Sequence, residues 1–213
     1  MRKYRITHRT TYRYDAPMTD GYTVACLVPR PTPWQRVLAS RVELQPTASE
    51  SDSYLDVFGN LVYQFGFHEP HQEMTVEAFS SVEIDEREVP VDATPWETVV
   101  AELDGLGGSD AIDIGFFRAK STFVDTAALA DQLRELTAPT FTPGRGIVDA
   151  TQALCELIYR DFQFDAGFSD VSTPLGQVLS ARRGVCQDFA QLAVACLRSL
   201  GLAARYVSGY IET

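Results

Sequence analysis

The sequence lacks the features of a membrane-inserted or exported protein. No stretch of its 213 residues approaches the roughly 20 consecutive apolar residues that span a bilayer. The basic residues at positions 2, 3 and 5 are not followed by the apolar segment of a secretion signal. We therefore expect a cytoplasmic protein with no membrane partner.

Cysteine and histidine are also scarce. The four cysteines are scattered along the chain, at Cys26, Cys155, Cys186 and Cys196. They form no Cys-x-x-Cys pair, which argues against a thioredoxin-type redox motif, and without an export signal we expect reduced thiols. All three histidines lie in the first third of the chain: His8, His68 and His71. No cluster of further ligands stands near the last two, so we expect no metal site.

Positive charge is in the minority. Lysine and arginine number 18 against 29 aspartates and glutamates, which gives a formal net charge of −11. Without a long basic run, such a chain is a poor candidate for binding nucleic acid or an anionic membrane. Apolar residues make up 45% and charged residues 22%, proportions that are ordinary for a globular protein.

The first 88 residues predict an antiparallel β-sandwich-like domain. Residues 2–14 alternate between aromatic or β-branched residues on one face and mostly basic or polar residues on the other, which is typical of a half-buried strand. Gly59-Asn60 suits a two-residue hairpin turn. Further strands, separated by turn residues, are predicted over 21–28, 37–44, 54–58, 61–67 and 74–84.

The remaining residues, 89–213, predict a second and mainly helical domain, so the fold class is α+β. Residues 89–95 are typical of a linker, and Ser172-Thr173-Pro174 is typical of a helix start with a hydroxyl cap. Gly201 suits a helix C-terminus. We predict helices over 97–106, 126–136, 147–159, 172–182 and 186–200, followed by a strand over 203–211.

Cys186 stands at the start of the predicted helix over 186–200. Unpaired backbone N–H groups and the helix dipole favour a thiolate at such a position, and the same N–H groups can bind an oxyanion. Gly184 would let a substrate chain approach closely, and Arg182 and Arg183 would add positive potential. The pattern alone leaves open that Cys186 is a small, buried apolar residue.

The run from Arg183 to Ala190, RGVCQDFA, followed by residues 197–210, resembles the bacterial transglutaminase-like superfamily. Residues 4–14, 29–30, 56–60 and 70–71 resemble the small β domain that often precedes this core. The resemblance implies that Cys186 is the nucleophile of a thiol enzyme. It would attack a carboxamide or peptide carbonyl of a peptide or protein substrate and pass the acyl group to water or to an amine. No cofactor is implied.

In the family, a histidine and then an aspartate follow the cysteine, whereas no histidine follows Cys186 here. We therefore expect a truncated chain that contains the nucleophile, lacks its base, and is inactive by itself. The resemblance also implies a second oxyanion donor upstream of the cysteine, and Gln163 is our candidate. The alternative function is a non-catalytic interaction module that retains the scaffold.

Three further expectations concern Asp188, the other two cysteines of this domain and the end of the chain. We expect Asp188 to cap its helix or pair with Arg182 or Arg205, rather than to act in catalysis. Cys155 and Cys196 lie on apolar helix faces, where we expect them to be buried and inert. The apolar strand over 203–211 would expose an unpaired edge, so we expect the chain to self-associate through it.

Overall fold

The structure is a computed structural model that describes residues 1–88, 90–170 and 172–212. The chain forms two compact units, Met1–Val89 and Pro90–Thr213. Residue 89 of the expected linker and residue 213 lie outside the described residues. No helix among the described residues is long and apolar enough to cross a membrane.

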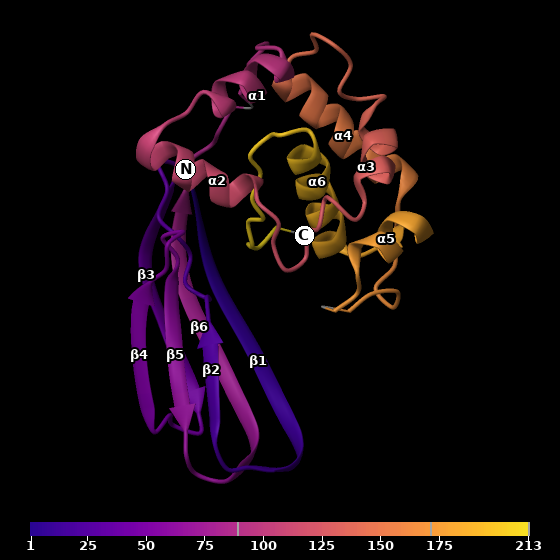
Figure 1. Ribbon diagram of the computed structural model, residues 1–213. Coiled ribbons are helices and arrows are strands. Elements are labelled where there is room, and N and C mark those ends of the chain that lie inside the picture. The colour runs from indigo at the N-terminus through magenta and orange to yellow at the C-terminus, as the bar shows by residue number, and fades with distance from the viewer. Residues whose placement is uncertain (89, 171, 213) are drawn as a thin grey trace. The chain divides into compact units, whose positions relative to one another are not determined.

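The first unit consists of two three-stranded antiparallel sheets (Figure 1). One sheet has the order β1 (Arg2–Met18), β6 (His71–Ile84) and β3 (Gln35–Gln45); the other has the order β2 (Gly21–Ala25), β5 (Leu61–Phe67) and β4 (Glu50–Leu55). Buried side chains from both sheets, including Phe65 and Phe67 on β5 and Met74 and Val76 on β6, form a common core. The predicted β-sandwich-like architecture is therefore confirmed.

The hairpin between β4 and β5 differs from the predicted one. The last pair of the ladder is Leu55 with Leu61, so the connection has five residues instead of two. The Asp56 carboxylate accepts hydrogen bonds from the backbone N–H groups of Phe58 (2.9 Å) and Asn60 (2.8 Å). Of the five residues of this loop, only Gly59 has a positive φ, 76°. The two-residue turn was a wrong prediction because Asp56 organises a wider loop around itself.

His68, which follows β5, lies between two carboxylates. Its Nδ1 is 2.8 Å from Oδ1 of Asp20, and its Nε2 is 3.5 Å from Oε1 of Glu50. The hydrogen bond to Asp20, together with the negative charge of both carboxylates, raises the pKa of His68 above its ordinary value of 6.5. These contacts tie β5 to the segments that enter β2 and β4.

We expect His68 to make the stability of the first unit dependent on pH. Because its pKa is raised in the folded state, its contacts stabilise the fold fully below pH 6.5, and this contribution is lost as the pH rises through the folded-state pKa. Imidazole NMR resonances, of which the chain has only three sets, would measure the titration. Asp20→Asn should return the midpoint toward 6.5; an identical midpoint in both proteins would contradict the assignment.

The second unit is mainly helical. Its helices are α1 (Trp96–Asp104), α2 (Gly108–Arg118), α3 (Ala130–Thr137), α4 (Ile147–Asp161), α5 (Leu175–Ala181) and α6 (Cys186–Ser199). A short parallel pair, β7 (Gln163–Phe164) and β8 (Arg183–Gly184), completes the described elements. The helices predicted over 97–106, 147–159 and 186–200 are confirmed as α1, α4 and α6, whereas α2 was not predicted.

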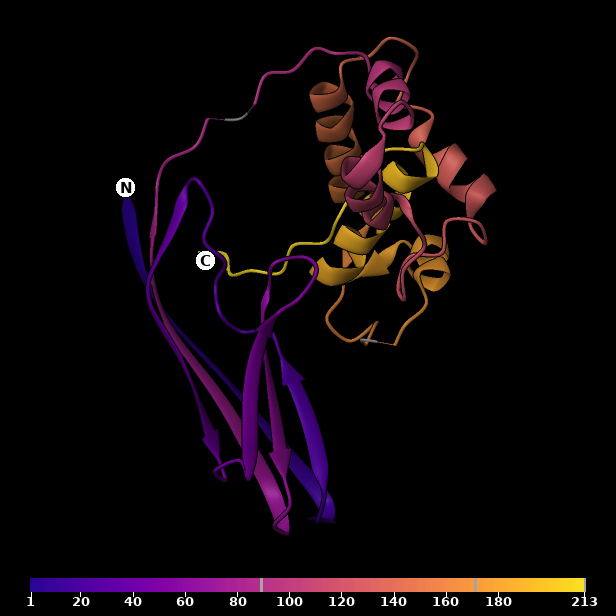
Figure 2. The same cartoon turned by 60° about the vertical axis from the view of Figure 1, so that its left-hand side comes forward.

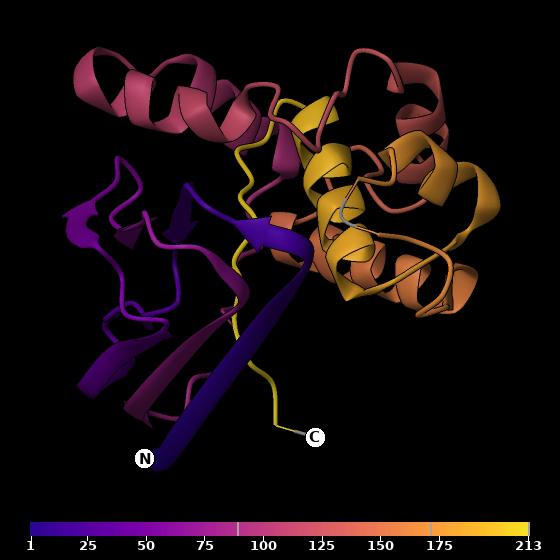
Figure 3. The same cartoon turned by 90° about the horizontal axis from the view of Figure 1, so that it is seen from below.

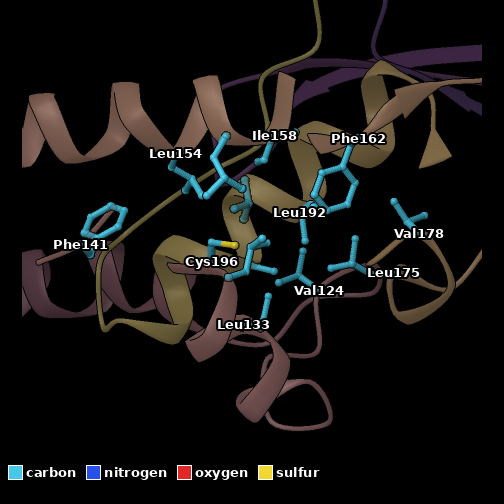
Figure 4. Close-up of a cluster of buried hydrophobic side chains, with 14 of the residues drawn as sticks. Val124, Leu133, Phe141, Leu154, Ile158, Phe162, Leu175, Val178, Leu192 and Cys196 are labelled. Atoms are coloured by element: carbon cyan, nitrogen blue, oxygen red, sulfur yellow. The ribbon is translucent and has the colours of Figure 1, made fainter. Parts of the chain in front are cut away.

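Helix α6 lies at the centre of this unit, in contact with α3, α4 and α5 (Figure 3). Its buried residues Leu192 and Cys196 face side chains of the surrounding helices, among them Leu133 of α3 and Leu154 of α4 (Figure 4). The apolar stripe of α6 therefore forms the middle of the core. The position of Cys186, the first residue of the helix, is fixed by this packing.

Two local predictions in this unit were wrong. Helix α5 begins after Pro174 without a side-chain cap; the Thr173 hydroxyl instead accepts a hydrogen bond from the Asp170 N–H at 2.9 Å and donates one to the Asp170 carboxylate at 3.2 Å. Residues 203–212 form no strand. Their extended path (Figure 2) is attached near Ala204, whose N–H donates to the carbonyl of Phe117 at 3.0 Å, and no strand of the described chain pairs with them. Self-association through this segment stays a proposal.

Candidate functional site

Cys186 is the first residue of α6 and is exposed. Val185 before it has an extended backbone, with φ −112° and ψ 177°, so the chain turns from β8 into the helix at this point. The exposure excludes the alternative in which Cys186 is a buried apolar residue. The thiol therefore lies at the positive end of a helix that the core holds in place.

The parallel pair β7–β8 supports the segment that leads into Cys186. The N–H of Gln163 donates to the carbonyl of Arg182 at 2.8 Å, and the N–H of Asp165 donates to the carbonyl of Gly184 at 2.9 Å. Gln163 is exposed on β7, opposite Arg183 in the register. It is thus on the strand beside the nucleophile segment, and its role as an oxyanion donor stays a prediction.

Asp188 caps the start of α6, as expected. Its carboxylate accepts a hydrogen bond from the backbone N–H of Val185 at 2.7 Å and a second one from the Ser169 hydroxyl at 2.5 Å, both at Oδ2. The side chain is only 6% exposed. Of the two alternatives, the structure therefore has the cap, and among the described residues Arg182 lies by Asp161 instead.

Gly184 has a different role from the expected one. A Cβ atom at this position would lie 2.8 Å from Oδ2 and 2.9 Å from Cβ of Asp188. Real Cβ atoms do not approach other atoms so closely, and glycine is needed because Asp188 packs against the backbone here. The space beside Gly184 is therefore filled by the protein and is not open to a substrate chain.

The two arginines before Gly184 do not provide unpaired positive charge. Arg183 forms an ion pair with Asp165, and Arg182 lies 3.8 Å from Asp161. Each guanidinium also lies over an aromatic ring, that of Phe168 or Phe162. The positive potential at Cys186 is thus left to the helix start itself.

Backbone donors are available at this helix start. The first N–H of α6 with a carbonyl partner in the helix pattern is that of Phe189, which donates to Val185 at 3.1 Å. Among the described residues, no hydrogen bond uses the N–H groups of Cys186 and Gln187. Two such donors beside a thiol have the chemistry of an oxyanion-binding site.

A small hollow lies on one side of α6, and Cys186 is not among its lining residues. It is lined by residues of α6, of α5 and the loop before it, and of the segment after α2: Phe123, Asp170, Thr173, Leu175, Gln187, Asp188 and Gln191. No group of three or more histidine, cysteine or acidic side chains that could bind a metal occurs within the described ranges. His68 and His71 instead make hydrogen bonds to Asp20 and to the carbonyl of Glu69.

The other cysteines of this unit differ from Cys186 in two separate ways. Cys196 is buried, as expected, and burial raises its pKa to about 12. Cys155 was expected to be buried but is exposed, because it lies on the outer face of α4. It therefore provides an exposed thiol in the middle of a helix, without the backbone donors of a helix start.

We expect iodoacetamide to alkylate Cys186 faster than Cys155 and Cys196. Cys155 matches Cys186 in exposure, so a difference between them reports the helix start, whereas Cys196 is protected by burial. Peptide mass spectrometry after short exposures near neutral pH would measure the three rates in one sample. Labelling of Cys186 that is no faster than that of Cys155 would count against an activated thiol.

Comparison with known proteins gives the family. Residues 4–83 match the bacterial transglutaminase-like N-terminal region, and residues 128–213 match the transglutaminase-like superfamily. The chain is 38% identical to "Uncharacterized protein Rv2569c" of Mycobacterium tuberculosis (strain ATCC 25618 / H37Rv), over 99% of this chain and 66% of that protein. It is 35% identical to "Uncharacterized protein ML0607" of Mycobacterium leprae (strain TN), over 100% of this chain and 72% of that protein.

The fold is also similar to a solved structure. The crystal structure of "a Putative Cysteine Protease from Cytophaga hutchinsonii" aligns with 94% of this chain and 64% of that one, with a TM-score of 0.70 and 18% sequence identity. At this level of identity the similarity concerns the fold. The chain spans about two thirds of the length of the Mycobacterium tuberculosis relative.

The two family matches and these relatives give the class: the chain belongs to the transglutaminase-like superfamily, and its exposed thiol lies at the start of the central helix of the second unit. Within it, the first unit is the bacterial transglutaminase-like N-terminal region. The RGVCQDFA run that carried the resemblance in the sequence lies at β8 and the first residues of α6. Membership in this superfamily supports a thiol enzyme in general.

Proposed function

We propose that the whole protein transfers or hydrolyses acyl groups at a carboxamide or peptide bond, with Cys186 as the nucleophile. The observation that carries this proposal is the position of Cys186, exposed at the start of α6 beside the two available N–H groups. The developing oxyanion would there meet donors that are already oriented. The substrate would be a peptide or protein.

In the first step, the Cys186 thiolate attacks the carbonyl carbon and forms a carbon–sulfur bond. The carbonyl oxygen becomes an oxyanion, which the N–H groups of Cys186 and Gln187 stabilise, with the Gln163 amide as a further donor. The carbon–nitrogen bond then breaks, and ammonia or an amine leaves with a proton from the general acid. Water or a second amine attacks the thioester and regenerates the thiol.

The proposal requires a general base for these proton transfers. The three histidines of the chain all lie in the first unit, and His68 is already held by Asp20 and Glu50. We propose that the base is supplied by the rest of the whole protein, since this chain spans about two thirds of the Mycobacterium tuberculosis relative. It follows that residues 1–213 alone should show no turnover, and turnover that depends on Cys186 in this chain would contradict the assignment.

The test is to trap the thioester. The whole protein would be incubated with benzyloxycarbonyl-glutaminyl-glycine, quenched in acid and digested for peptide mass spectrometry. We expect the peptide that contains Cys186 to gain the acyl group with loss of ammonia, and hydroxylamine to remove it as a hydroxamate. If neither this probe nor a set of protein-derived peptides labels Cys186 or is cleaved, the non-catalytic interaction module becomes the better description.

A further inference from the structure

Asp188 joins two segments that are separate in the sequence, namely the run from Gly184 into α6 and the loop before α5. It belongs to α6, its Oδ2 accepts hydrogen bonds from Ser169 in the loop before α5 and from Val185 before the helix, and its carboxylate packs on Gly184 of β8. Asp188 is only 6% exposed, so it is 94% buried. A buried carboxylate lowers the stability of the fold unless hydrogen-bond donors are placed to meet it. Asp188 has two such donors, the N–H of Val185 and the hydroxyl of Ser169.

These contacts hold the backbone of the segment that leads into Cys186. Val185 directly precedes the cysteine, and its N–H is held by Asp188 while its carbonyl accepts the first hydrogen bond of the helix, from Phe189. The direction of the Cys186 side chain and of the N–H groups at the helix start depends on this residue. The Ser169 hydroxyl in turn holds the Asp188 carboxylate from the side of the loop.

We propose that Asp188 and Ser169 are positioning residues, which hold the Cys186 thiol and the adjacent backbone donors in the orientation required for attack. The proposal rests on the proposed function of Cys186. Misplacement of a nucleophile by about 1 Å can lower the rate by roughly 10²-fold, so such a brace has a large effect without touching the substrate.

The alternative is that the negative charge of Asp188 itself acts on the reacting groups. Two substitutions separate these roles. Asp188→Asn removes the charge but keeps an oxygen that can accept both hydrogen bonds. Asp188→Ala removes the oxygen that accepts them and leaves the Val185 N–H and the Ser169 hydroxyl without this partner. A positioning role predicts rescue by asparagine, and a charge role does not.

The experiment measures ammonia release from benzyloxycarbonyl-glutaminyl-glycine by the whole protein. We expect Asp188→Asn to keep kcat within about threefold and Asp188→Ala to lower it at least about 30-fold, with KM changed less than about twofold in both. Ser169→Ala, which removes one of the two hydrogen bonds, should lower kcat by about 3- to 10-fold. Ser180→Ala is the matched control, since the Ser180 hydroxyl donates only within α5, to the carbonyl of Gly176.

Thermal unfolding of each variant would show whether it folds, and if Asp188→Ala does not, Ser169→Ala against Ser180→Ala decides. An unchanged kcat in Ser169→Ala and Asp188→Ala, or equal losses in Asp188→Asn and Asp188→Ala, would overturn the proposal. The ratio of Cys186 to Cys155 alkylation is a second readout that needs no turnover. A wild-type protein without turnover, but with a ratio that falls in Asp188→Ala and Ser169→Ala, would contradict the proposed function and leave the positioning role standing.

Discussion

Replacing Cys186 by alanine should lower the turnover of the whole protein by at least about 10³-fold. When a nucleophile is removed, the covalent path is lost, and only binding and oxyanion stabilisation remain. The measurement is ammonia release from benzyloxycarbonyl-glutaminyl-glycine, with hydroxylamine present to detect acyl transfer. Because Cys186 is exposed, its removal should change the free energy of unfolding by less than about 0.5 kcal/mol.

Cys155→Ala is the control for this experiment. It removes another exposed thiol of the same unit, from α4, and should leave turnover unchanged. Turnover that survives Cys186→Ala would overturn the proposed mechanism. A parallel loss in both variants would show instead that the assay reports a general effect of losing a thiol.

Replacing Leu192 by alanine should produce a large loss of stability in the second unit. Leu192 is 0% exposed at the centre of α6, and the surrounding helices leave little room for relaxation. Deletion of a buried leucine side chain of this kind costs about 2–5 kcal/mol, from lost burial and from the cavity that remains. Urea unfolding followed by the circular dichroism of helices would measure it, since all the described helices lie in this unit.

Ile112→Ala on α2 is the comparison for Leu192→Ala. Ile112 is 64% exposed, so its replacement should change the free energy of unfolding by less than about 0.5 kcal/mol. The urea midpoint should fall for Leu192→Ala without a change in the slope. Equal effects of the two substitutions would mean that α6 is not the centre of the core.

The sequence predicted best the elements that are buried on one side. The alternation along β1 and the stripe of α6 survive in the structure as half-buried or buried faces, because burial is what creates such periodicity. Helix α2 was missed and has no buried residue among those described, but the same is true of α1, which was predicted, so burial alone does not explain the difference. Cys155 was misplaced because its neighbours on α4 are buried although it faces outward.

The candidate site divides in the same way. Cys186 could be predicted because its motif is continuous in the sequence. The hydrogen bond between Ser169 and Asp188 could not be predicted, since the two residues are 19 apart in the sequence and meet only through the fold. The role of Gly184 was misjudged because the sequence does not show that the turn from β8 into α6 brings the side chain of Asp188 back onto it.

The central position of α6 has a consequence for fluctuations. A helix whose residues Leu192, Ala195 and Cys196 are buried cannot open alone, so its hydrogen-bonded amide hydrogens, from Phe189 onward, should exchange with solvent only through cooperative opening of the second unit. The segment 205–212, whose side chains are all exposed, should exchange much faster. The Cys186 thiol would then lie on one of the slowest-exchanging helices of the protein. Agents that loosen the packing of the core should therefore change the position of the thiol before any side chain of the site is altered.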